Sequence, residues 1–288
     1  MTTALTAAPA GSCLPARHHA TAVRIAEAMP ARGGRPWTVR AGSAWWTTRP
    51  TAHLTQGART LLIAFGPWDT AVGWQSSDRE PYEPDARLQS INPENIARET
   101  LRLVLPDADD HAAARLEPES GARSRLATLN EVGERARSHG AVTHHHLGML
   151  PNSHVMAWTS RTSGVRYAVT LTGTNPVAEI ALSGPNVAIA RVLPRFLDLP
   201  PQGDVGRAEL HDVTGRMQRR MASHLRDFTS VLQEDDGSLT IGRARGPYGT
   251  IAAPTDPHSR VRDDSPAAAV LHSVGTDFLL TLLPHIAP

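Results

Sequence analysis

Arginine and tryptophan recur together near the N-terminus of this 288-residue chain, between Arg32 and Arg59. A guanidinium group pairs in bidentate fashion with phosphate oxygens, and an indole ring offers a flat face on which a nucleobase stacks. This combination predicts a surface that binds nucleic acid. Its candidate residues are Arg32, Arg35, Trp37, Arg40, Trp45, Trp46 and Arg49.

The same stretch has a second, structural interpretation. In it the indole rings belong to a hydrophobic core, and the arginines pair with acidic residues of the neighbouring segment. Trp45 and Trp46 are adjacent, so on a strand their side chains would point to opposite faces. Only one of the two would then fit a given core.

The charge distribution favours contact with a negatively charged partner. Every basic residue is an arginine; residues 1–60 carry a net charge of +6 and residues 61–120 a net charge of −7, although the whole chain is nearly neutral at +1. We expect such segments to contact nucleic acid or an acidic protein surface. The alternative is a scaffold or assembly subunit, in which the positive segment of one copy meets the negative segment of another and forms a homo-oligomer.

A run of histidines is the second group that could do chemistry. If residues 142–148 form a strand, His144 and His146 share one face, and a hairpin through Pro151-Asn152 brings His154 opposite them. Three imidazoles on one face resemble a zinc or iron site and predict, as a further alternative, a metal-dependent enzyme. No carboxylate lies nearby in the sequence to orient them. The competing interpretation is a histidine run at a strand end without a ligand.

Several classes of catalysis are excluded by composition. Without lysine the chain cannot form a Schiff base, a lysine-containing phosphate-binding loop or a protein-kinase site. The single cysteine, Cys13, excludes an intrachain disulfide and a cysteine-based zinc site. The Gly-x-Ser-x-Gly and Gly-x-Gly-x-x-Gly motifs are absent as well. We therefore expect a non-catalytic binding protein without a cofactor.

Hydrophobic periodicity and turn residues place the elements. Residues 17–29 predict an amphipathic helix ended by Pro30, and Gly66-Pro67-Trp68-Asp69 predicts a hairpin turn. Asn92 is predicted to cap a helix that starts with Pro93. The remaining predicted helices are 123–138, one starting near 186, a long one at 207–232 and a last one closing at 283–284. The predicted strands are 37–40, 44–48, 60–65, 70–75, 142–148, 154–159, 165–172, 238–243 and 250–253.

The order of these elements predicts an α+β fold with antiparallel sheets, helices packed on one face, and an internal duplication of a helix–three/four strands–helix unit. We expect a flexible N-terminal tail at 1–16, α+β units at 17–106 and 107–200, and a C-terminal helix–hairpin–helix unit at 201–288. No segment approaches the roughly 20 apolar residues that span a bilayer, and the tail lacks the pattern of a secretory leader. A cytoplasmic protein without membrane contact is therefore expected.

Overall fold

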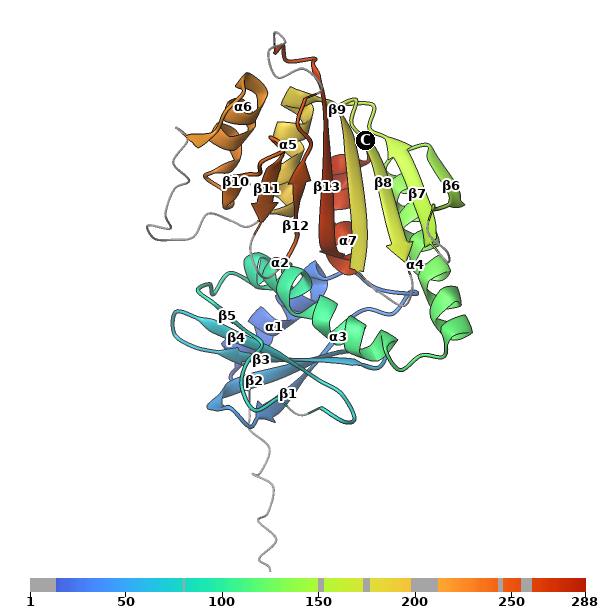
Figure 1. Ribbon diagram of the computed structural model, residues 1–288. Coiled ribbons are helices and arrows are strands. Elements are labelled where there is room, and N and C mark those ends of the chain that lie inside the picture. The colour runs from blue at the N-terminus through green and yellow to red at the C-terminus, as the bar shows by residue number, and fades with distance from the viewer. Residues whose placement is uncertain are drawn as a thin grey trace, which may run out of the picture. The chain divides into compact units, whose positions relative to one another are not determined.

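The computed structural model describes residues 14–79, 81–149, 153–172, 177–197, 212–242, 246–254 and 261–288. It contains helices and two antiparallel sheets, which confirms the predicted α+β class. The chain forms two compact units, residues 1–108 and 109–288, and the division falls within helix α3 (Leu105–Ala113) (Figure 1). The predicted tail at 1–16 lies outside the described residues as far as residue 13.

The first unit is a five-stranded antiparallel sheet with two helices. Its strands are neighbours in space in the order in which they occur along the chain. Helix α1 packs on β1 and β2 and also against α2. The elements are α1 (Ala16–Ala28), β1 (Thr38–Ala44), β2 (Thr47–Gln56), β3 (Arg59–Phe65), β4 (Thr70–Gln75), β5 (Ala86–Leu88) and α2 (Pro93–Leu103).

Residue alternation decides which face of this sheet is covered. Ala52 and Leu54 of β2 share a face with Leu61 and Ile63 of β3, and all four are 0% exposed. The alternate positions of β1 and β2 are mainly polar; Thr38, Arg40, Gly42, His53 and Thr55 remain partly or fully exposed, whereas Thr51 is buried. One face of the β1–β2 ladder therefore packs in the core while the other stays open.

Turn and capping residues act here as their types predict. The turn from Gly66 to Asp69 joins β3 and β4 and is closed by a 2.9 Å hydrogen bond from Gly66 N to Asp69 O. The Asn92 side chain accepts a 3.1 Å hydrogen bond from Asn95 N at the start of α2. Both local predictions are confirmed.

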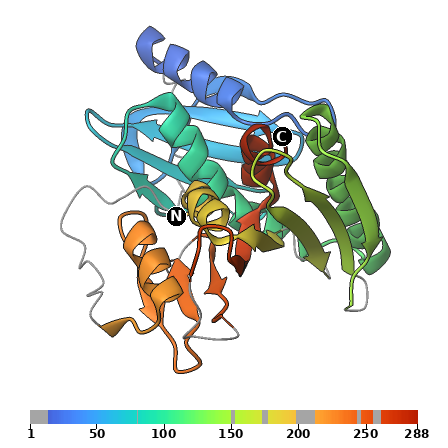
Figure 2. The same ribbon diagram turned by 90° about the horizontal axis from the view of Figure 1, so that it is seen from above.

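The second unit is an eight-stranded antiparallel sheet in the order β10-β11-β12-β13-β9-β8-β7-β6. Helix α4 packs on β7, α5 on β9 and β13, and α7 on β13. Figures 1 and 2 show α4, α5 and α7 on the same side of the sheet. The elements are α4 (Pro118–Ser138), β6 (Thr143–Leu147), β7 (Ser153–Thr159), β8 (Arg166–Thr172), β9 (Val177–Pro185), α5 (Asn186–Phe196), α6 (Arg216–Leu225), β10 (Val231–Gln233), β11 (Leu239–Gly242), β12 (Tyr248–Ile251), β13 (Pro266–Gly275) and α7 (Thr276–Ile286).

One order of elements occurs twice in the second unit, first as α4, β6 to β9 and α5, then as α6, β10 to β13 and α7. The two closing helices are each 11 residues long, and Pro194 and Pro284 hold the ninth position in them. The leucine before each proline, Leu193 or Leu283, is 0% exposed. The predicted duplication compared other segments, 17–106 and 107–200, and it stays a prediction.

Three predicted features differ from the structure. The long helix at 207–232 is shorter, because α6 ends at Leu225 and β10 starts at Val231; residues 207–211 lie outside the described part. The predicted strand at 44–48 is interrupted, because Trp45 and Trp46 form the turn between β1 and β2. The predicted boundary at 200/201 separates strands of one sheet, because β9 pairs directly with β13.

Among the described residues, no helix has the length and apolar character needed to cross a membrane.

Candidate functional site

Arg32 and Arg35 flank a two-residue turn just before β1. Their backbones exchange hydrogen bonds of 3.1 and 3.0 Å, and the glycines between them have φ values of 54° and 74°. Such positive values fit a tight hairpin turn that glycine adopts without strain. The buried Gln56 side chain of β2 anchors the turn through a 2.9 Å hydrogen bond to Arg35 O. This end of β2 thereby holds the Arg35 backbone in place.

Arg40 lies on the open face of β1, directly opposite His53 of β2. Arg40 Nη2 stands 3.5 Å from His53 Nδ1, and His53 Nε2 stands 2.9 Å from Ser43 O. The tautomer that fits both contacts donates Nε2–H to Ser43 O and accepts from Arg40 at Nδ1. A Cβ atom at Gly42 would overlap the imidazole ring, so the glycine makes room for it. His53 and Gly42 thus position the Arg40 guanidinium.

Burial lowers the pKa of His53 below its ordinary value of 6.5. The hydrogen bond with Ser43 opposes this shift of the pKa, and the charge of Arg40 adds to it. The imidazole is therefore neutral near pH 7, and the positive charge of the pair resides on Arg40.

The three candidate tryptophans have different surroundings. Trp45, in the β1–β2 turn, is 77% exposed. Trp46, its neighbour, is half-buried, and its ring lies near Gly73 of β4. Trp37 is only 6% exposed, so its ring is closed to a base. Burial of Trp37 and Trp46 matches the structural interpretation of these two residues, whereas Trp45 faces solvent.

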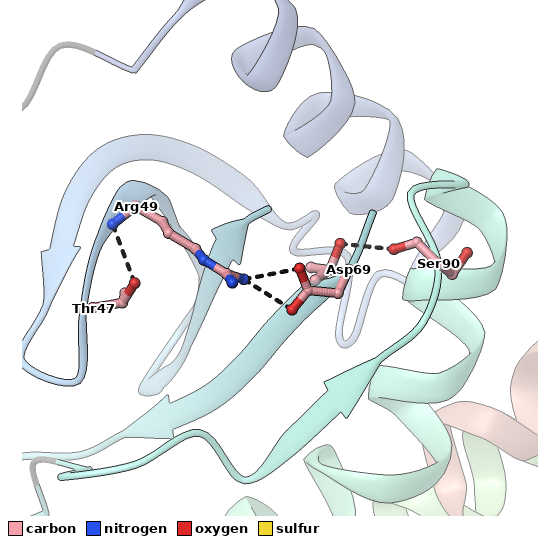
Figure 3. Close-up of polar contacts among 5 residues, drawn as sticks. Thr47, Arg49, Asp69 and Ser90 are labelled. Atoms are coloured by element: carbon pink, nitrogen blue, oxygen red, sulfur yellow. Dashed lines mark hydrogen bonds and ion pairs between the residues drawn. The ribbon is translucent and has the colours of Figure 1, made fainter. Parts of the chain in front are cut away.

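Arg49 of β2 forms an ion pair with Asp69 in the β3–β4 turn, as Figure 3 shows. Its Nη1 atom donates to both carboxylate oxygens of Asp69, at 3.0 and 2.8 Å. Thr70 then donates a 2.9 Å hydrogen bond to Ser90 O, which continues the contacts toward α2. A Cβ atom at Gly66 would stand 2.7 Å from Arg49 Nη1, so the glycine leaves room for this ion pair. The Arg49 charge is thus engaged within the chain.

Trp68 was not among the predicted site residues. It sits in the β3–β4 turn and is 82% exposed. Because consecutive strands of this sheet are antiparallel neighbours, the β1–β2 and β3–β4 turns lie at the same end of the sheet. Trp45 and Trp68 therefore lie at the same end of the first unit. The predicted turn at 66–69 was the available signal, because a large aromatic in the middle of a hairpin turn has no core to enter.

The acidic segment neutralises part of the positive segment. Arg24 pairs with Glu94 at 2.6 Å and Arg49 pairs with Asp69 at 2.8 Å. In the part of the chain that the structure describes, Arg35 and Arg40 form no ion pair. The structural interpretation therefore accounts for some of these arginines but not for all of them.

The histidine run lies on β6, and its predicted grouping is wrong. The register with β7 sets Leu147 opposite His154, so His154 shares a face with His145 rather than with His144 and His146. The rings of His145 and His154 are stacked with centroids 5.5 Å apart. No group of three or more histidine, cysteine or acidic side chains within the described residues could hold a metal ion.

A polar cluster on strands β9, β12 and β13 of the second sheet was not predicted from the sequence. His272 Nδ1 of β13 stands 3.1 Å from Glu179 Oε2 of β9, and the Tyr248 ring of β12 lies 5.3 Å from the imidazole. A register shift follows Leu271, and Ser273 beside it has a φ of 56°. Bulges of this kind re-aim side chains. Only the sheet pairing brings these distant residues together.

In comparisons with models of protein families, with curated proteins and with solved structures, no match to this chain was found.

Proposed function

We propose that this chain binds single-stranded nucleic acid along the open face of β1 and β2. Arg32, Arg35 and Arg40 hold phosphates, while Trp45 stacks on a base. Trp68, at the same end of the sheet, is a second stacking platform. Trp37, Trp46 and Arg49 serve the fold of this surface instead of touching the ligand.

The observation that carries the proposal is the exposure of Arg35 and Arg40 without a carboxylate partner in the described part of the chain. A guanidinium that already pairs with a carboxylate has to leave it before it can bind a phosphate. Arg40 contacts the neutral His53 ring, at 3.5 Å, and forms no ion pair with the described residues. Its charge is therefore available to an external anion.

The spacing of these groups suits an extended strand. From Thr38 to Ala44, β1 spans seven residues, which is about 20 Å at the usual rise per residue. The Arg32–Arg35 turn lies before this strand and Trp45 follows it. Exposed rings can stack only on unpaired bases, so a single strand is favoured over a duplex.

The test is a salt titration of binding to a labelled single-stranded oligonucleotide. Phosphate contacts release counterions, and each contributes about 0.7 to the slope of log affinity against log salt for single strands. The double variant R35A/R40A is expected to lower that slope by about 1.4. The matched control R123A removes one exposed arginine from α4 and is expected to leave the slope unchanged.

Stacking is tested separately. Trp45→Ala is expected to weaken binding by about 1–3 kcal/mol, or roughly 5- to 150-fold in Kd. Tyr248→Ala removes a partly exposed aromatic ring from the second unit and serves as the control. Affinity that does not change with salt overturns the proposal. Oligomers that dissociate with salt but do not bind the oligonucleotide would favour the scaffold alternative.

A further inference from the structure

The strand β6, which carries the histidine run, is the last strand of the eight-stranded sheet as described. Its residues His144 to Leu147 are all exposed. Three of the exposed large hydrophobic residues flank or belong to it: Val142 at 55%, Leu147 at 75% and Met149, which is fully exposed. Edge strands are usually protected by charge, proline or a bulge. The β6–β7 ladder has an unbroken register, and β6 contains neither proline nor an acidic or arginine residue.

The alternation of hydrogen-bonded pairs between β6 and β7 shows which backbone groups of β6 point away from β7. Gly148 N donates to Ser153 O at 2.9 Å, so the pair Gly148–Ser153 is hydrogen-bonded. Pairs alternate along an antiparallel ladder, so His144 and His146 also exchange bonds with β7. Thr143, His145 and Leu147 therefore point their N–H and C=O groups away from β7.

This outward pattern is self-complementary. If a second copy approaches in antiparallel orientation with the two His145 residues opposite each other, Thr143 lies opposite Leu147 of the partner copy. All three outward residues of each chain then form hydrogen-bonded pairs. The arrangement is closed by a twofold axis through His145, as an isologous dimer requires.

The same register brings imidazoles together. His144 of one copy becomes directly opposite His146 of the other, in a non-hydrogen-bonded pair with Cα atoms about 4.5 Å apart. Two such pairs gather four imidazoles on one face of the joined sheet. His145 and its stacked neighbour His154 lie on the opposite face and take no part. Imidazole nitrogens are preferred ligands of Zn²⁺, which four of them can surround.

We propose that β6 pairs with β6 of a second copy and that His144 and His146 of both chains bind one Zn²⁺ on the twofold axis. A five-residue edge buries little area compared with the roughly 1,000 Å² of a stable interface. The ion supplies the missing affinity, so the dimer depends on zinc. This ligand set uses two chains and excludes His154, unlike the site expected from the sequence. The proposed site is built from residues of the second unit alone, and the proposal does not rest on the function of the β1–β2 surface.

The test measures mass in solution by light scattering during size exclusion, with ZnCl₂ or with a chelator. The full chain is expected to be monomeric with chelator and dimeric with zinc, and to bind one zinc per two chains. The variant H144A/H146A is expected to remain monomeric in zinc. A zinc-bound monomer, or a wild-type chain that does not dimerise, overturns the proposal.

A matched pair of variants tests the strand pairing itself. His145→Ala and His145→Pro both remove an imidazole that takes no part in the metal site. Only proline removes the outward N–H, and it spares the bonds to β7 because those come from the neighbouring residues. His145→Ala is expected to dimerise in zinc and His145→Pro to stay monomeric, with circular dichroism confirming that both are folded. Equal dimerisation of the two variants rules out the β6 ladder.

Discussion

His53 and Arg40 face each other across the β1–β2 ladder, with His53 Nδ1 3.5 Å from Arg40 Nη2. The contact requires a neutral imidazole, because a protonated ring has no acceptor at Nδ1. Below the pKa of His53 two positive charges would face each other. The geometry of the candidate surface is therefore linked to pH.

Stability should decline in mild acid through His53. Its pKa is lowered in the folded chain, mainly by burial, so the unfolded chain takes up the proton first as pH falls below about 6.5. Folding stability then rises with pH through this window and is lost as pH falls. Melting temperatures from pH 7.5 to pH 5 should decline less in His53→Gln than in the wild type. His19→Gln, an exposed histidine of α1, should follow the wild type.

Gly42 and His53 should be energetically coupled. A Cβ atom at residue 42 would collide with the imidazole, so Gly42→Ala is expected to cost about 1–3 kcal/mol, as overpacking typically does. In a His53→Ala background the ring is gone and the same change should cost little. Urea unfolding of both single variants and the double variant gives the coupling energy. Additive costs would contradict the contact.

Tyr167 should make the second unit sensitive to alkali. Burial raises the pKa of its hydroxyl from the ordinary value of 10.0 to about 12. Between these two pH values the unfolded chain loses the proton that the folded chain keeps, so stability falls as pH rises. Thermal unfolding from pH 9 to pH 11.5 should show a smaller decline in Tyr167→Phe than in the wild type. Tyr248→Phe, at a partly exposed ring, should retain the full decline.

Replacing Ser273 with glycine should raise the free energy of unfolding. Its φ of 56° lies in the left-handed region, which costs an L-residue about 1–2 kcal/mol. Ser273→Gly relieves this cost but adds chain entropy to the unfolded state, so a net gain of about 0.5–1 kcal/mol is expected. Ser183→Gly on β9, whose backbone is extended, should lose a similar amount. Denaturant midpoints compare the two, and a loss at both positions would contradict the strain.

The sequence predicted helix caps and tight turns correctly, because these depend on a few adjacent residues. Asn92 caps α2 and the Gly66–Asp69 turn closes β3–β4. The helix predicted at 207–232 was too long at its C-terminal end, because Phe228 and Leu232 continue a helical spacing after Leu225. Leu232 lies instead on β10, where partners from β11 decide its conformation.

The candidate sites depended on information that periodicity does not carry. The face of His154 is fixed by the register of β6 and β7, and a shift of one residue reverses it. Glu179 and His272 meet only because β9 and β13 are neighbours in the sheet. Arg40 was predicted from its type alone, but its partner His53 required the pairing of β1 with β2.

The two strands at the middle of the larger sheet leave the ribosome far apart in time. β9 ends at Pro185 and its neighbour β13 begins at Pro266, and at about 5–20 residues per second several seconds separate them during synthesis. Until β13 has been synthesised, β9 lacks its neighbour on one side and is an edge strand of the nascent chain. An exposed strand edge of this kind is a template for pairing with another polypeptide.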